Sequence, residues 1–174
     1  PVVAREVPLS ISRETSFTAD TADPREIEGM LEYLTGRACR AARELSLTAR
    51  TVSVRLRYSD GESADQSRSL AQASAVDPVV LALALQLCGR LHTRRVSLHA
   101  IGITLSNFVH DAAEQGALFD EPHAGRRAAL CEALDRVRSD FGHGSVVSGR
   151  ALHLKGVVPE DRYGFVLRTS SLTK

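Results

Sequence analysis

The chain has 174 residues, of which 43% are hydrophobic and 25% charged, a composition typical of a globular protein that can build an apolar core. Its 22 basic and 21 acidic residues give a net charge of +1, so the overall charge does not indicate a nucleic-acid partner. The longest apolar run, residues 79–87, is too short to span a membrane, and neither a signal peptide nor a disulfide framework is recognisable, so we expect a soluble, cytoplasmic protein with no membrane partner.

The first elements in chain order are a strand and a helix. Residues 9–19 alternate in polarity, which predicts a strand. An Asp-Pro pair at 23–24 is typical of a helix start, and apolar residues spaced three and four apart extend this helix to about residue 46. The outer face of the helix is expected to carry Arg37, Arg40 and Arg43.

A β-hairpin, a second helix and a fourth strand follow. Residues 50–59 alternate cleanly, Asp60-Gly61 is a strong turn signal, and residues 64–70 return as the second strand of the hairpin. A second Asp-Pro pair precedes a helix over 79–91 that is apolar nearly all round. Residues 96–106 predict another strand, whose alternation slips near its centre and suggests a bulge.

This order of elements predicts an α+β fold, in which a four-stranded antiparallel sheet carries two helices on one face. The other face would be open, and it would bear Ser53, Arg55 and Arg57. Arginine forks and hydroxyl groups suit phosphate oxygens, whereas a face without aromatic rings does not suit base stacking. The alternative is a solvated sheet face, with an arginine content that reflects a GC-rich genome.

Residues 109–124 predict a linker, and residues 125–141 predict a third helix before an irregular tail. The apolar stripe of the third helix is expected to consist of Leu130, Leu134, Val137 and Phe141. The linker contains Leu118 and Phe119, an apolar pair that suits a hydrophobic groove on a partner. The same pair could instead staple the third helix onto the domain, and the pattern leaves both interpretations open.

No catalytic centre is recognisable. The chain has no phosphate-binding loop and no GxGxxG, HExxH or GxSxG motif, and its six histidines are scattered without the spacing of metal ligands. Turn and helix-cap roles account for its carboxylates better than acid–base chemistry does. We therefore expect no catalytic residue, no metal and no cofactor in this chain.

About residues 8–108 resemble the little-finger domain of bacterial Y-family DNA polymerases of the polymerase IV type. The resemblance lies in SISRETSF at 10–17, the helix at 24–46, TVSVRLRYSDGESADQSRSL at 51–70 and IGITLSNF at 101–108. It implies the little-finger fold and a domain that grips the backbone of primer–template duplex DNA largely without reading sequence. The backbone contacts that it implies are Ser12, Arg13, Arg55, Arg57, Ser67, Arg68 and Ser69.

The segment QGALF at 115–119 resembles the pentapeptide with which members of this family bind the replication sliding clamp. The matching residues are Gln115, Leu118 and Phe119. Gly116 replaces a leucine, which is expected to weaken clamp binding. Two departures lie in the domain itself: Gln66 stands where the family often has a basic residue or threonine, and Gly61 where an aromatic residue is usual.

The resemblance divides the chain into a linker remnant (1–8), a little-finger domain (9–108), a linker with the clamp-binding motif (109–124), and a C-terminal helix and tail (125–174). Because the chain starts at Pro1, we expect a piece of a longer, bacterial and cytoplasmic polymerase of DNA repair and translesion synthesis, with its catalytic magnesium ions in the absent palm. Two alternatives remain: a catalytically inactive Y-family adaptor of a mutagenesis complex, and an interaction module with no DNA role.

Overall fold

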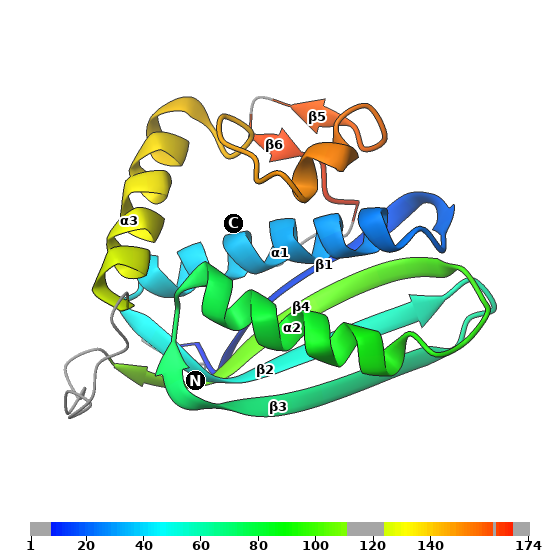
Figure 1. The fold of residues 1–174 in the computed structure, drawn as a ribbon, viewed down its shortest axis with the longest axis horizontal. Coiled ribbons are helices and arrows are strands. Elements are labelled where there is room, and N and C mark those ends of the chain that lie inside the picture. Colours follow the sequence, from blue (N-terminus) through cyan, green and yellow to red (C-terminus); the bar gives the residue numbers. More distant parts are fainter. Residues whose placement is uncertain (1–7, 111–123, 162, 169–174) are drawn as a thin grey trace, which may run out of the picture.

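The computed structural model describes residues 8–110, 124–161 and 163–168. Residues 10–110 form a four-stranded sheet and two helices (Figure 1). The strands are β1 (Ser10–Thr21), β2 (Leu47–Tyr58), β3 (Ser63–Ser74) and β4 (Leu98–His110), and the helices are α1 (Pro24–Glu44) and α2 (Asp77–Leu91). None of the helices in the described part of the chain has the length and apolar character needed to cross a membrane.

The sheet is antiparallel throughout, with the strand order β1-β4-β2-β3. Both helices lie on the same face of the sheet (Figure 1), and the predicted α+β fold with its four-stranded antiparallel sheet is therefore confirmed. In this strand order β4, the last of the four strands in the sequence, lies inside the sheet, and β1 and β3 are the two edge strands. A surface that spans all four strands consequently combines residues from both ends of the domain.

The core lies between the sheet and the two helices. In β2 every second side chain points into this layer: Val52, Val54, Leu56 and Tyr58 are at most 1% exposed. Burying one such apolar side chain contributes about 1.5–3 kcal/mol to stability. Because side chains of a strand alternate between its faces, the intervening residues of β2 must point to the uncovered side.

The two Asp-Pro pairs have different roles. Asp23 caps α1, because its carboxylate accepts a hydrogen bond of 2.9 Å from the Arg25 backbone N–H, as the sequence predicts. The second pair does not repeat this arrangement: α2 begins at Asp77, the cap position is Val76, and no side chain caps this helix. The Asp77 carboxylate turns instead to Arg43, with 2.6 Å between Oδ1 and Nη1.

The C-terminal part of the chain forms a further layer on α1. It consists of α3 (Ala124–Phe141), the 3₁₀ helix η2 (Ala151–Leu154), and a small hairpin of β5 (Glu160–Asp161) and β6 (Gly164–Phe165). Figure 1 shows η2 and the hairpin on the side of α1 that faces away from the sheet. The helix α1 therefore lies between two layers and is buried on both of its sides.

Close contacts hold the C-terminal layer on α1. The rings of Tyr33 and Phe165 meet edge to face with their centroids 4.9 Å apart. At Gly29 a Cβ atom would lie 2.9 Å from the carbonyl oxygen of Arg150, so this position must stay without a side chain. The backbone N–H of Arg168 then donates a 3.1 Å hydrogen bond to Thr15 Oγ1, which connects the end of the described chain with β1.

Most of the apolar stripe predicted for α3 faces solvent instead of the rest of the protein. Leu130, Val137 and Phe141 are 58%, 37% and 73% exposed, whereas Cys131 is buried. Polar contacts account for this orientation, because Asp135 faces Arg43 with 2.7 Å between Oδ2 and Nε. Packing of α3 on α1 and α2 thus follows the charged residues more than the apolar ones.

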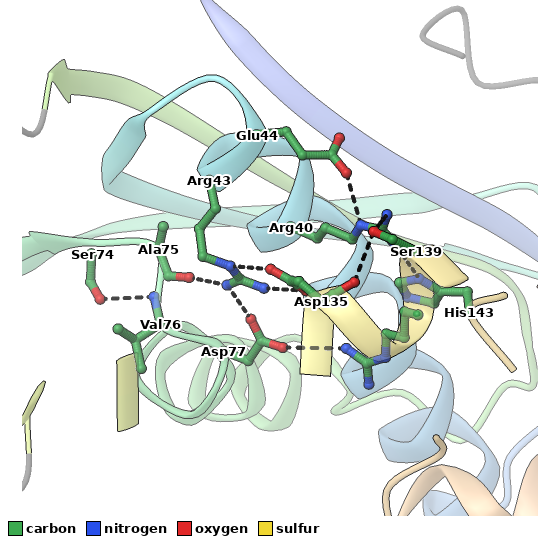
Figure 2. A network of polar contacts seen from close by, with 11 residues as sticks. Arg40, Arg43, Glu44, Ser74, Ala75, Val76, Asp77, Asp135, Ser139 and His143 are labelled. Atoms are coloured by element: carbon green, nitrogen blue, oxygen red, sulfur yellow. Dashed lines mark hydrogen bonds and ion pairs between the residues drawn. The ribbon is translucent and has the colours of Figure 1, made fainter. Parts of the chain in front are cut away.

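Arg43 is the centre of this packing (Figure 2). Its guanidinium donates to both oxygens of Asp135, to Asp77 and to the carbonyl oxygen of Ala75. Burial lowers the pKa of Arg43, but its hydrogen bonds with Asp135 and the charge of Asp77 outweigh burial, so that the pKa is raised. Of the arginines predicted for the outer face of α1, Arg43 therefore joins three segments of the chain.

Candidate nucleic-acid interface

The uncovered sheet face carries two complete rows of hydroxyl groups. In each row, one residue from every strand stands beside its partner in the next strand, as the strand register shows. The first row is Ser10, Ser106, Thr51 and Ser69, and the second is Ser12, Thr104, Ser53 and Ser67. We call these eight residues the hydroxyl rows. Neighbouring strands lie about 4.8 Å apart, so each row presents four hydroxyls at regular intervals.

Part of this hydrogen-bonding capacity is used within the face. The hydroxyls of Thr51 and Ser69 lie 3.3 Å apart, and the Asn107 side-chain amide donates a 3.0 Å hydrogen bond to Thr51. Ser53 donates a longer bond of 3.4 Å to the Gln66 carbonyl oxygen. A hydroxyl can donate one bond and accept others, so the rows can reorient toward a partner that offers acceptor oxygens.

The next two rows of the same face carry its charges. Arg55 stands between Gly102 of β4 and Asp65 of β3, and Arg57 stands beside Ala100. Glu14 belongs to the same row as Arg55, on the other side of Gly102. These rows therefore hold two arginines and two carboxylates, and their formal charges cancel.

A shallow hollow of about 190 Å³ lies between the hydroxyls and the charged side chains. Gly102 forms part of its lining together with Ser12, Ser53, Glu14 and Arg55. A Cβ on Gly102 would lie 3.2 Å from Cβ and Cγ of Glu14, so the glycine leaves room for the carboxylate side chain to cross toward β2. The hollow is polar and open, and it suits a small anionic group better than an apolar ligand.

Five of the residues predicted to contact DNA lie together on this open face. They are Ser12, Arg55, Arg57, Ser67 and Ser69, contributed by β1, β2 and β3. The strand register that brings them together agrees with the alternation seen in the sequence. This surface is therefore a coherent candidate interface.

Arg13 lies on the opposite side of the sheet, contrary to its assignment to the same contact surface. It pairs with Ile103 in the register, beneath the helical layer, and is 9% exposed. Its Nη1 donates a 2.8 Å hydrogen bond to the Ser12 carbonyl oxygen. Burial, and then the nearby charge of Arg37, lower its pKa. Alternation along β1 explains this placement, because Ser12 and Arg13 must face opposite ways.

Arg68 does not lie on the open face either. It stands opposite Val52, whose side chain is in the core, so Arg68 is directed to the helix side of the sheet. Because β3 is an edge strand, Arg68 is nevertheless exposed. The predicted clamp-binding residues Gln115, Leu118 and Phe119 lie outside the described residues, in the segment between the end of β4 and the start of α3.

Sequence reasoning missed several residues of this face. The hydroxyl residues that it did not place there are Ser10, Thr104 and Ser106, and the carboxylates are Glu14 and Asp65, whereas Ser53 was expected on this face without being assigned a DNA contact. The alternation of side chains between the two faces of a strand would have identified these residues, one strand at a time. The rows themselves depend on the strand order and register, which a single sequence does not contain.

Residues 8–118 match the family described as the impB/mucB/samB family C-terminal domain. A DNA polymerase IV from Dehalococcoides mccartyi (strain CBDB1) is 30% identical over 156 residues, which are 89% of this chain and 39% of that protein. A DNA polymerase IV from Caulobacter vibrioides (strain ATCC 19089 / CIP 103742 / CB 15) is 32% identical over 145 residues, which are 82% of this chain and 35% of that protein. The chain thus spans well under half the length of the curated relatives it matches.

Two solved structures are similar to part of this chain. One is described as a complex of the beta-clamp processivity factor and the little finger domain of PolIV, with a TM-score of 0.49, 14% identity, and coverage of 63% of this chain and 97% of that one. The other is an insertion ternary complex of Dbh DNA polymerase, with a TM-score of 0.48, 17% identity, and coverage of 59% of this chain and 29% of that one.

Proposed function

Because this chain belongs to the impB/mucB/samB family, whose C-terminal domain its residues 8–118 match, we propose that it is the DNA-binding little-finger region of a translesion Y-family DNA polymerase. The observation that carries this proposal is the open sheet face, on which the hydroxyl rows border Arg55 and Arg57. The parent polymerase would work in the bacterial cytoplasm, on primer–template DNA.

The chemistry of the face favours a grip on the phosphate backbone. Hydroxyls donate to phosphate oxygens without a net charge, and arginine adds charge and a two-pronged donor. None of these groups requires a particular base, so the contact would be independent of sequence. With two arginines on the described part of this face, binding would also be weak, which suits a domain that must let damaged DNA pass.

The salt dependence of such an interface can be stated in advance. Each phosphate that an arginine neutralises contributes about −0.9 to the slope of log K against log salt concentration. Two arginines therefore predict a slope of magnitude about two, while hydroxyl contacts add affinity without changing the slope. A steep slope would require basic residues outside this face.

Recruitment by the sliding clamp is the second part of the proposal. It is supported by the match of Gln115, Leu118 and Phe119 to the clamp-binding pentapeptide and by the position of this segment directly after the domain. Nucleotidyl transfer and its magnesium ions would belong to the palm of the parent polymerase. Within the described part of the chain, no group of three or more His, Cys, Asp or Glu side chains could hold a metal ion.

One observation favours a different partner. Because Glu14 and Asp65 share the rows of Arg55 and Arg57, the charged part of the face has no net charge, as is common in protein–protein contacts. An interaction module without a DNA role is therefore the second candidate. A catalytically inactive adaptor with the same fold would carry the same interaction module.

The deciding experiment is fluorescence anisotropy of a labelled, blunt-ended DNA duplex at several salt concentrations. Replacing both Arg55 and Arg57 with alanine should weaken binding and flatten the salt slope by roughly one to two units. Arg90 and Arg136 are exposed residues of α2 and α3, and their double alanine variant is a control with the same loss of charge. Equal effects of the two double variants, or no binding at low salt, would contradict the DNA-binding proposal.

A further inference from the structure

A second depression, with a mixed polar and apolar lining, lies on the helix side of β1. It is a groove of about 830 Å³ between β1, the C-terminal half of α1 and the C-terminal end of α3. Four arginines and two aromatic residues dominate its chemistry, and we call these six the basic groove. They are Arg13, Arg37, Arg40, Arg138, Phe141 and Tyr163.

The groove has an excess of positive charge. Against its four arginines stand two carboxylates of the lining, Glu44 and Asp140, and Arg138 also lies 4.0 Å from the Asp77 carboxylate of α2. Glu44 is already paired with Arg40, with 2.8 Å between Oε1 and Nε. Among the described residues, Arg37 has no carboxylate within 4.0 Å, and its guanidinium lies 5.9 Å from the centre of the Tyr33 ring. An anion entering the groove would therefore meet uncompensated charge.

His143, which lines the groove, has a pKa that reflects the same positive charge. Burial, and then the charges of Arg138, Arg37, Arg40 and Arg13, lower its pKa to about 3. The imidazole is therefore neutral at physiological pH, and its Nδ1 can accept a hydrogen bond from Arg40, 3.5 Å away (Figure 2). Arg40 also donates to Ser139 Oγ at 3.0 Å, so it is held in place at the junction of α1 and α3.

Aromatic residues stand at the edge of this charged surface. Phe141 is 73% exposed and Tyr163 is 58% exposed, although both belong to packed segments of the chain. Exposed rings beside arginines are the combination with which proteins hold single-stranded nucleic acids: the basic groups follow the backbone and the rings stack on bases. An acidic peptide would satisfy the arginines but would leave the rings without flat partners.

We propose that the basic groove binds single-stranded nucleic acid, with phosphates on its arginines and bases on Phe141 and Tyr163. The groove and the hydroxyl rows lie on the two sides of the edge strand β1, where Ser12 faces one site and Arg13 the other. A strand that leaves a duplex on the sheet face would need only to pass around this edge to reach the groove. The inference does not depend on the duplex proposal, because the arginines and aromatic rings of the groove are not part of the hydroxyl rows, although Ser10 borders both sites.

The test is anisotropy of a labelled oligothymidylate of about 12 nucleotides, a length within the usual site sizes for single-strand binding. Replacing both Phe141 and Tyr163 with alanine should weaken this binding by at least about tenfold, because each stacked base contributes substantially. Replacing Arg37 with alanine should weaken it and reduce the magnitude of the salt slope by about 0.7. The control is Leu152→Ala with Val157→Ala, two exposed apolar residues of the same layer outside the groove.

Duplex binding, measured with the same variants, separates the two proposals. Alanine at Phe141 and Tyr163 should leave the affinity for a blunt duplex within about twofold, while alanine at Arg55 and Arg57 should leave oligothymidylate binding nearly unchanged. An unchanged single-strand affinity of the aromatic variant, with its thermal midpoint intact, would overturn the inference. So would a polyglutamate peptide that displaces the oligonucleotide at equal charge concentration, because the groove would then be a general site for polyanions.

Discussion

Glu14 and Arg57 form an ion pair across the central strand β4, with 3.3 Å between Oε1 and Nη2. Glu14 lies on the edge strand β1 and Arg57 on β2, so the two side chains must meet above β4. They can do so because β4 has Gly102 and Ala100 at this level. The carboxylate therefore occupies a position on Arg57 that a DNA phosphate would otherwise take.

This competition predicts that Glu14→Gln strengthens duplex binding. Removing the charge frees Arg57 and removes a repulsion from the incoming phosphate, and the ion pair is exposed enough to be weak. We expect an affinity about two- to fivefold higher, measured by anisotropy at fixed salt concentration. Glu160→Gln, which makes the same change at an exposed position of β5, should have a smaller effect. If both variants bind equally well, Glu14 acts only through the overall charge.

Loss of Arg43 should destabilise the whole described structure. Arg43→Ala would leave Asp135 partly buried without its partner and Asp77 with only the more distant Arg138 at 4.0 Å, and breaking such a pair costs about 3 kcal/mol. Urea unfolding followed by circular dichroism would measure this loss. Arg136→Ala, at an exposed position of α3, is the matched control and should change stability by less than about 0.5 kcal/mol. Similar losses in both variants would mean that α3 is not anchored by Arg43.

His143 predicts a specific dependence of stability on pH. Its pKa is lowered to about 3 in the folded protein, whereas an unfolded histidine has a pKa near 6.5. Between these values the unfolded chain binds the additional proton, so stability is fully present above pH 6.5 and falls by about 1.4 kcal/mol per pH unit on acidification below it. Denaturant unfolding of the parent protein and of His143→Gln between pH 7 and 5 would isolate this proton. Parallel curves for the two proteins would contradict the assignment.

Clamp binding provides a test that does not involve DNA. Alanine at both Leu118 and Phe119 should abolish binding to the sliding clamp in surface plasmon resonance, because these two residues would be the apolar anchors. The thermal midpoint should remain nearly unchanged. A large decrease in the midpoint would instead identify the pair as a staple of α3, and retained clamp binding would exclude the motif. Alanine at Leu130, an exposed residue of α3, is a control for the loss of an apolar side chain.

The sequence predicted the sheet layer well because local signals determine it. Alternation in β2, the Asp60-Gly61 turn and the Asp23 cap of α1 are each determined by residues close together in the chain. The bulge predicted around Ala100–Gly102 is not there, because these residues pair in regular register with β2; the extra residue of β4 relative to β2 is His99, nearer the start of the strand. Neighbouring residues thus determine the elements and the direction in which their side chains point.

The parts that were missed depend on contacts between distant segments. The partner of Asp77 is Arg43, 34 residues away, so a capping pattern could not reveal that its carboxylate leaves the helix end. Likewise, the buried side of α3 is determined by Asp135 and Cys131 facing α1 and α2, although its apolar stripe lies elsewhere. Arg13 was assigned by resemblance to a motif, whereas its burial follows from alternation along β1.

The position of α1 between two layers has a consequence for folding cooperativity. Residues that match the family end at 118, yet Gly29 and Tyr33 of α1 contact residues 150–165, far beyond that point. Both layers therefore pack on the same helix, and the opening of either layer would expose an apolar side of α1 to solvent. The unit that shares this helix is therefore larger than the family domain matched at residues 8–118.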